Sequence, residues 1–269
     1  MPMMDSHLLA GQVAASTMRI LVLGGTTEAS ALAQRLADDT RFEATLSLAG
    51  RTSTPRAQPL ATRVGGFGGV DGLARYLREH GIEAMIDATH PYADQISANA
   101  VAACNQCNVP LASLVRPPWQ AVSGDHWQSV ASAAEAAATL GPTPQRVFLS
   151  LGRLDLHTFA AAPRHHYLAR TIDPPEQSGL PPDIRFIRAR GPFDRTAETR
   201  LLVDEQVDVI VSKNSGGSAT YPKIEVAREL DLPVIMIERP YKAAGDVVFS
   251  PDEAIGWLVR HGAPSRRGV

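Results

Sequence analysis

The chain alternates between two patterns of apolar and polar positions. Short apolar runs, typical of buried strands, are separated by stretches in which apolar residues recur every three or four positions, as on one face of a helix. Strands that alternate with helices in this way are typical of a parallel sheet built from βαβ units. In the first half the pattern predicts strands at 19–23, 43–48, 61–64, 84–87 and 111–115, and helices at 28–37, 70–80 and 93–107.

The same plan returns in the second half, offset by about 125 residues. The order of the matching segments is preserved and their spacing is nearly constant. This repeat favours two similar units over one large domain, with shared α/β patterning as the alternative explanation. The matching segments are 19–25 with 146–152, 82–87 with 207–212, and 109–117 with 232–240.

We therefore predict an α/β fold with two tandem Rossmann-like doubly wound parallel-sheet domains and a ligand cleft between them. Residues 1–17 are expected to be a disordered tail, 18–122 the first domain and 123–269 the second. Whether the two domains exchange edge strands is left open. In such sheets ligands bind beyond the carboxyl ends of the strands, where the strand order reverses. The loops after the predicted strands therefore carry the candidate chemistry.

Composition narrows the class of protein. Of the 269 residues 44% are hydrophobic and 20% are charged, which argues against disorder and coiled coil. The net charge is −2, with 9 basic and 10 acidic residues before Gly124 and 17 and 18 from there on, so neither part has the excess of Lys and Arg expected of a nucleic-acid binder. No apolar run approaches the roughly 18–20 residues of a membrane span, and no basic segment precedes the apolar stretch at 8–10. We expect a cytoplasmic protein that binds neither nucleic acid nor membrane.

The only two cysteines, Cys104 and Cys107, have the C-x-x-C spacing of some redox and zinc sites. They fall inside an apolar helical stretch, and no other cysteine is present to complete a zinc site. We expect neither a redox role for this pair nor a bound metal.

Two glycine-rich loops of the first half favour a bound dinucleotide. The loop at 24–28 follows the first strand and opens a helix, where phosphates meet backbone N–H groups. A tight turn without a ligand would use the same residues. The loop at 65–69 has four glycines around Phe67, and each glycine costs conformational entropy on folding. We expect something flat or charged to lie against this backbone, the alternative being a flexible turn.

The end of the second predicted strand indicates the kind of dinucleotide. NAD-binding domains carry an acidic residue about 20 positions after the glycines, and NADP-binding domains carry a cation there. Arg51 stands at this point with no carboxylate nearby, which predicts NADP(H) unless the arginine is only solvated. The predicted cofactor-binding residues are Gly24, Gly25, Thr26, Thr27, Glu28, Arg51, Thr52, Gly66, Phe67, Gly68, Gly69, Asp87 and Thr89.

The loop after the fourth predicted strand brings a carboxylate, a hydroxyl, an imidazole and a phenol together within 87–92. His90 and Tyr92 are both candidate proton donors beside a hydride acceptor. A histidine before a proline is more often a hydrogen-bonding group of its loop, so this role for His90 stays a hypothesis.

The corresponding loops of the second half are cationic. All three lysines of the chain stand in these loops or in the first turn beyond them, although the chain otherwise uses arginine. This placement indicates an anionic ligand; salt bridges or solvent-facing charges are the alternative for any single residue. The predicted substrate-binding residues are His90, Tyr92, Arg116, Arg153, Arg190, Lys213, Asn214, Ser215, Gly216, Gly217, Lys223, Arg239 and Lys242.

Five segments together resemble the precorrin-6A reductase family of cobalamin biosynthesis, namely 24–29, 65–69, 87–93, 116–119 and 213–217. The resemblance runs from about Met18 to Trp257. It implies an NADPH-dependent reductase that adds hydride to one carbon of the precorrin-6A macrocycle and a proton to its neighbour, giving dihydroprecorrin-6. The acetate and propionate carboxylates of this tetrapyrrole-derived ring suit loops rich in Arg and Lys. Neighbouring enzymes of the pathway are further candidate partners.

Three alternatives remain at this point. A sister enzyme, the NADH-linked cobalt-precorrin-6A reductase of the anaerobic pathway, shares the motifs. A non-enzymatic NADP(H)-binding redox sensor would use the second domain to dock a protein. An enzyme acting on nucleotide-sugars would usually carry a Tyr-x-x-x-Lys pair, but Tyr221 has Glu225 where the lysine should stand.

Overall fold

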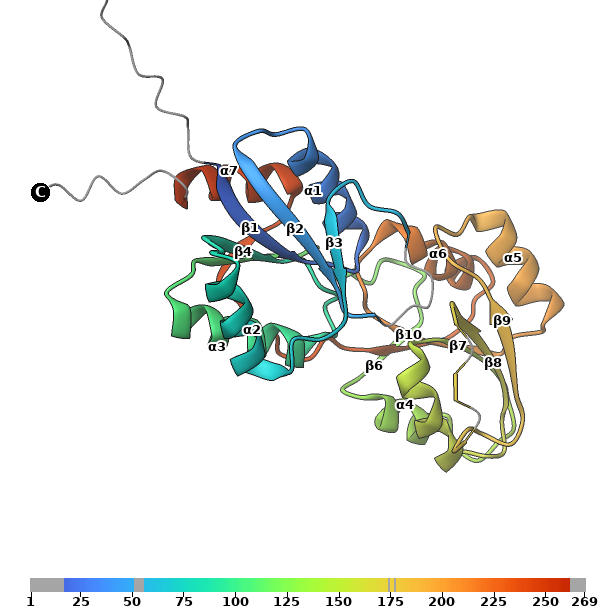
Figure 1. The fold of residues 1–269 in the computed structure, drawn as a ribbon. Coiled ribbons are helices and arrows are strands. Elements are labelled where there is room, and N and C mark those ends of the chain that lie inside the picture. Colours follow the sequence, from blue (N-terminus) through green and yellow to red (C-terminus); the bar gives the residue numbers. More distant parts are fainter. Residues whose placement is uncertain (1–16, 51–55, 174, 177, 262–269) are drawn as a thin grey trace, which may run out of the picture.

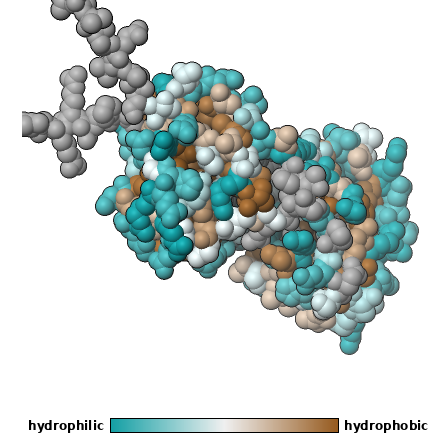
Figure 2. Space-filling model, viewed as in Figure 1, coloured by the Kyte–Doolittle hydropathy of each residue, from teal (hydrophilic) through white to brown (hydrophobic). Residues whose placement is uncertain are grey.

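The computed structural model describes residues 17–50, 56–173, 175, 176 and 178–261. Its strands form two six-stranded sheets, and every neighbouring pair of strands is parallel (Figure 1). We call the first sheet and its helices the first unit, and the second sheet and its helices the second unit. The two units form two lobes (Figure 2). The predicted fold of two Rossmann-like parallel-sheet domains is confirmed.

The first sheet has the order β12-β5-β4-β1-β2-β3, in which the direction of winding reverses between β1 and β4. Helices α1 (Thr27–Ala37) and α7 (Pro251–His261) cover one face, and α2 (Gly69–Glu79) and α3 (Asp94–Cys107) cover the other. All the strands and helices predicted in the first half are present, with ends that differ by at most one residue. The strands are β1 (Met18–Leu23), β2 (Phe42–Leu48), β3 (Ala61–Val64), β4 (Ala84–Asp87), β5 (Leu111–Leu114) and β12 (Asp246–Val248).

The second sheet has the equivalent order β6-β11-β10-β7-β8-β9. Helix α4 (Ala133–Thr139) and the 3-10 helix η1 (Arg153–Ala161) pack on one face. Helices α5 (Arg195–Asp204) and α6 (Pro222–Glu229) pack on the other, and the short 3-10 helix η2 (Ser218–Thr220) precedes α6. The strands are β6 (Trp127–Val130), β7 (Arg146–Ser150), β8 (His166–Thr171), β9 (Ile184–Arg188), β10 (Val209–Lys213) and β11 (Val234–Ile237).

The chain crosses between the units twice, and this corrects the predicted division at 122 and 123. After β11 the chain returns to the first unit, where β12 pairs with β5 as the sixth strand of the first sheet. Helix α7 then buries Ala254, Trp257 and Leu258 in the core under α1. The elements between 246 and 261 therefore belong to the first unit, because their apolar side chains are buried on its sheet.

The cysteine pair lies on α3, where both thiols are free and Cys104 is buried. Burial raises the pKa of the Cys104 thiol to about 12. Within the described residues, no helix is long and apolar enough to cross a membrane.

Candidate active site

A cavity of about 170 Å³ opens where the carboxyl ends of β1, β2 and β3 meet the loop at 65–69. A Cβ at Gly66, Gly68 or Gly69 would meet no atom within 4 Å, so bare backbone forms this wall. Gly68 and Gly69 have φ values of +81° and +86°, a conformation that favours glycine. Six predicted cofactor-binding residues thus line one cavity, which we call the glycine cavity: Gly24, Gly66, Phe67, Gly68, Gly69 and Thr89.

Arg63 holds the loop of the glycine cavity in place, a role that the sequence did not suggest. Its guanidinium donates to the Ser47 Oγ at 2.7 Å and to the carbonyls of Gly65 and Gly66 at 2.9 and 3.1 Å. The same group lies 3.8 Å above the centre of the Phe67 ring, a favourable cation–π arrangement. Phe67 is therefore fixed as part of the wall.

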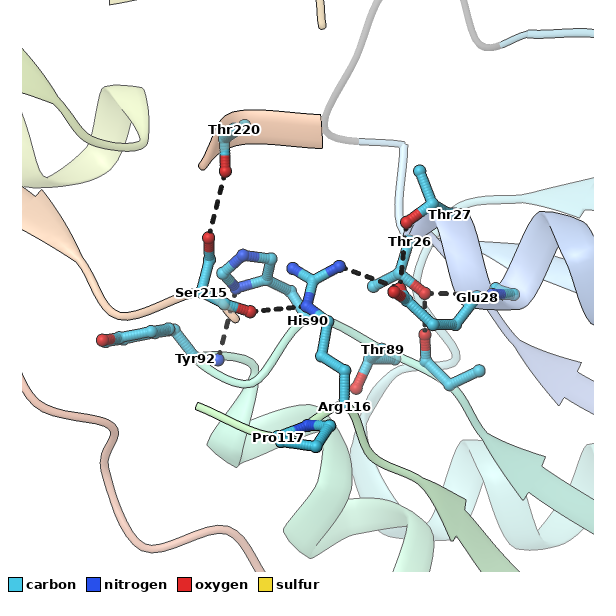
Figure 3. A network of polar contacts seen from close by, with 12 residues as sticks. Thr26, Thr27, Glu28, Thr89, His90, Tyr92, Arg116, Pro117, Ser215 and Thr220 are labelled. Atoms are coloured by element: carbon cyan, nitrogen blue, oxygen red, sulfur yellow. Dashed lines mark hydrogen bonds and ion pairs between the residues drawn. The ribbon is translucent and has the colours of Figure 1, made fainter. Parts of the chain in front are cut away.

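The loop at 24–28 joins β1 to α1, and its Gly24 lines the glycine cavity. Figure 3 shows Thr26, Thr27 and Glu28 of this loop. Gly24 is required by packing, because a Cβ there would lie 2.7 Å from Leu46 Cδ1, whereas Gly25 has a φ of +119° and faces open space. The Thr26 hydroxyl accepts from the Ala29 N–H and caps α1, and it donates to the Ala88 carbonyl at 2.8 Å.

The next two residues of this loop are polar and partnered. Thr27 Oγ1 donates to the Glu28 carboxylate at 3.1 Å, and the guanidinium of Arg116 donates to the same carboxylate at 2.8 Å. Arg116 comes from the loop after β5, so this ion pair connects two of the strand-end loops that the sequence singled out.

Asp87 organises the loop after β4 from inside the protein. It is 1% exposed, and its carboxylate accepts from the Thr89 N–H and hydroxyl at 3.0 and 2.6 Å and from the Ser97 hydroxyl at 2.5 Å. Lys242 Nζ lies 3.3 Å from the same carboxylate. With these partners Asp87 has no oxygen directed to the loop surface, so we expect it to hold the loop rather than to contact a cofactor directly.

A second cavity, of about 240 Å³, lies beyond the carboxyl ends of β4 and β5. Three cations line it, Arg116, Arg239 and Lys242, and we call it the cationic cavity. Thr89 lines both cavities, so the glycine cavity and the cationic cavity meet at this residue. Ser113 also lines the cationic cavity, and its buried hydroxyl has no hydrogen-bond partner within the described residues. Ser113 was not among the residues predicted from the sequence, where its only signal is that it is a polar residue inside the apolar run of β5.

The segments at 116–119 and 213–217 bind each other. The Asn214 side chain is buried; it accepts from the Trp119 N–H at 2.8 Å and donates to the Trp119 carbonyl at 3.0 Å. The guanidinium of Arg116 donates to the Ser215 carbonyl at 2.5 Å. Ser215 Oγ lies 3.3 Å from the Thr220 hydroxyl (Figure 3). Trp119 is buried in the core of the second unit, so the Asn214 bonds fasten the segment that crosses from the first unit onto the second, and Arg116 links this segment to the Ser215 loop.

Arg239 completes this connection. It donates to the carbonyls of Asn214, Arg116 and Pro117 at 2.8, 2.8 and 3.2 Å. Burial and the neighbouring Arg116 lower the pKa of its guanidinium. Gly216 and Gly217 pack directly beneath: a Cβ on Gly216 would lie 2.1 Å from the Pro117 carbonyl oxygen, and one on Gly217 would lie 2.9 Å from Arg116. These glycines let the arginines approach the backbone.

His90 lies between the Ser215 loop and the guanidinium of Arg116 (Figure 3). Its Nδ1 accepts from the Tyr92 N–H at 3.4 Å, which leaves Nε2 as the nitrogen that carries hydrogen. Partial burial, followed by the positive charges of Arg116, Lys213, Arg239 and Lys242, lowers the pKa of His90 to about 3. The imidazole is therefore neutral at physiological pH in the ligand-free protein.

Tyr92 and Lys213 form the second contact between the units. The Tyr92 hydroxyl donates to the Ile237 carbonyl at the end of β11, and burial raises the pKa of the phenol. Lys213 Nζ lies 4.9 Å from the centre of the Tyr92 ring and 2.6 Å from the Asp155 carboxylate. Tyr92 thus already donates its hydroxyl proton to a carbonyl, which argues against its predicted role as a proton donor.

The structure leaves several predicted site residues away from this centre. Lys223 is buried, donates to the Thr220 carbonyl at 2.9 Å and lies 4.8 Å from the centre of the Trp119 ring. Burial lowers its pKa to about 7. It lines neither cavity. Arg153, at the start of η1, and Arg190, on the loop after β9, are exposed and line neither cavity. Arg51 and Thr52 lie outside the described residues.

Comparison with known proteins shows the family of the chain. The model of the family described as precorrin-6x reductase CbiJ/CobK matches residues 19–259. The chain belongs to this family. It is 52% identical over 248 residues to the precorrin-6A reductase of Rhodobacter capsulatus, covering 92% of this chain and 98% of the relative. The solved structure of a CobK precorrin-6A reductase superposes with a TM-score of 0.87 at 53% identity, covering 94% of this chain and 100% of that one.

A more distant relative carries the other activity that the motifs left open. The cobalt-precorrin-6A reductase of Salmonella typhimurium is 31% identical over 238 residues, which cover 82% of this chain and 87% of that protein. Two of the segments that resemble the family, 116–119 and 213–217, contact each other. They lie where the chain crosses from the first unit to the second.

Proposed function

We propose that the protein is the NADPH-dependent precorrin-6A reductase of cobalamin biosynthesis. The observation that carries this proposal is the pair of cavities that meet at Thr89: one walled by bare glycine backbone and the other lined by Arg116, Arg239 and Lys242. A dinucleotide suits the first cavity and a polycarboxylate suits the second. The 52% identity to a protein named precorrin-6A reductase supports the choice of substrate.

The glycine cavity fits a nicotinamide dinucleotide on structural grounds. Any Cβ at Gly25, Gly66, Gly68 or Gly69 would occupy open space, so these positions give a ligand close access to the backbone. Together with Thr26 at the start of α1, they would hold its phosphates and ribose. When bound, the cofactor supplies a hydride. Arg51 remains our candidate for selecting NADPH over NADH, on the sequence argument alone.

The cations at the contact between the two units would bind the substrate carboxylates. Each charge-assisted hydrogen bond contributes on the order of 1.5–3 kcal/mol. Lys213 and Lys242 are paired with Asp155 and Asp87, so a substrate carboxylate would share or replace these partners. Within the described residues, Arg239 contacts three carbonyls and no carboxylate, which leaves its charge available. Arg153 at the start of η1 is a further, exposed candidate.

The proposal places the reaction in the cytoplasm, with neighbouring enzymes of the pathway as candidate partners. A cobalt-precorrin-6A reductase remains the second candidate, supported by the 31% identity to the Salmonella typhimurium protein. A redox sensor without catalytic activity is less well supported, because the cations converge at the contact between the two units instead of on an exposed docking surface.

The test compares four combinations of substrate and cofactor. Absorbance at the NADPH band is followed after precorrin-6A or its cobalt-containing analogue is added, each with NADPH and with NADH. The proposal expects the largest kcat/KM with precorrin-6A and NADPH. A preference for the cobalt compound with NADH would select the second candidate, and no oxidation in any combination would overturn the enzymatic proposal.

A further inference from the structure

His90 occupies a position that suits a proton donor, but its imidazole is neutral in the ligand-free protein and lacks the second proton that a general acid would give away. Its imidazole lies between the strand-end loops of the two units, beside the cationic cavity lined by its neighbours Thr89 and Pro91 (Figure 3). Nδ1 lies 3.4 Å from the Tyr92 N–H, at the long end of the hydrogen-bonding range, so uptake of a second proton at Nδ1 gives up only this weak contact. The remaining question is what would give the ring a proton.

The groups around His90 are predominantly cationic. Four cations from three segments act on the ring, and three of these cations are paired with carboxylates, which leaves an excess of one positive charge. The imidazole stays neutral because protonation would add another positive charge to this cluster. The cations and their partners are Arg116 with Glu28, Lys213 with Asp155, Lys242 with Asp87, and Arg239, which contacts only carbonyls within the described residues.

A substrate with several carboxylates reverses this balance. Each carboxylate that binds one of the four cations adds a negative charge close to the imidazole, and opposite charge favours the protonated ring. The phenol of Tyr92 cannot take over the role, because its hydroxyl is bonded to the Ile237 carbonyl.

We propose that His90 takes up a proton when the substrate carboxylates bind the surrounding cations, and then donates this proton to the macrocycle. The inference rests on the proposed function. The ring carbon–carbon double bond receives hydride from NADPH on one carbon and the Nε2 proton of His90 on the other, which leaves a single bond, NADP⁺ and a neutral imidazole. The next substrate restores the proton from solvent. Substrate binding and charging of the general acid are thereby one event.

The first test measures proton uptake. Precorrin-6A is titrated calorimetrically into the enzyme loaded with NADP⁺, which cannot deliver hydride, in buffers of equal pH and different ionisation enthalpy. Wild-type enzyme should take up more protons per substrate than His90→Gln, by up to one. His166→Asn, which alters an exposed histidine paired with Asp183, should behave as wild type. Equal uptake by wild type and His90→Gln would overturn the proposal.

The second test measures the chemical step in a single turnover with NADPH. His90→Gln and His90→Asn should slow it about 100-fold or more, the usual contribution of a general acid, with melting temperatures like that of wild type. His90→Ala should regain rate with added imidazole. A His90→Asn variant with wild-type single-turnover rate would overturn the proposal. If wild-type enzyme itself fails to oxidise NADPH with precorrin-6A, the proposed function fails, a distinct result.

Discussion

Asn214 offers the most direct test of how the segment that crosses from the first unit is fastened to the second unit. Its side chain makes two hydrogen bonds to the backbone of Trp119, and it is 4% exposed. Asn214→Ala leaves the N–H and the carbonyl of Trp119 without these partners. An unsatisfied buried polar group costs about 1–3 kcal/mol. Because water can enter the space left by the amide, we expect a total loss of about 2–4 kcal/mol in the free energy of unfolding.

The loss is measured by urea denaturation and by thermal melting. For a chain of this size 1 kcal/mol corresponds to roughly 2–4 °C in Tm, so a shift well outside experimental error is expected. The matched control is Asn105→Ala on the exposed side of α3, which should stay within about 0.5 kcal/mol of wild type. If Asn214→Ala also stays within that range, the segment at 213–217 does not fasten the crossing segment to the second unit, and its predicted role in substrate binding is favoured instead.

Three further predictions concern the cofactor and a buried lysine. Gly66→Val should raise the KM for NADPH about 10-fold or more without lowering Tm, because its side chain would fill open space in the glycine cavity; an unchanged KM would place the cofactor elsewhere. Arg51→Ala should raise the KM for NADPH far more than that for NADH, and equal effects would refute a contact to the 2′-phosphate. The buried Lys223, whose pKa is lowered to about 7, binds fewer protons when folded than when unfolded between about pH 7 and pH 10. The free energy of unfolding of the wild type should therefore rise by up to about 1.4 kcal/mol per pH unit across this window, and Lys223→Met should lose that slope in urea titrations at several pH values.

The helices and strands of the first half were predictable because each obeys a clear periodicity. The run at 84–87 and the helical stretch at 70–80 needed no long-range information. The partners of the edge strands were not predictable. Strand β12 has only the three residues Asp246–Val248, and its place beside β5 depends on α7 packing its apolar face under α1. Such a contact between distant segments leaves no periodic signal.

The sequence assigned the candidate site to particular loops, and several of these loops line the two cavities, but the contacts of individual side chains needed the structure. A sequence shows that Arg116, Asn214 and Gly216 lie at strand ends, yet not that they contact one another. Arg63 was overlooked because a cation within a strand has no motif, although its guanidinium holds the glycine loop. Lys223 was assigned to the substrate on its position alone, and its burial beside Trp119 became visible only in the fold.

The central claim is that this protein passes hydride from NADPH to precorrin-6A. The most direct measurement uses NADPH deuterated at both C4 positions of the nicotinamide, with precorrin-6A as the acceptor and mass spectrometry of the macrocycle product. The account predicts one deuterium in each reduced macrocycle and one NADP⁺ formed with it. Reduced macrocycle without deuterium, or no consumption of NADPH in the presence of precorrin-6A, would contradict the account.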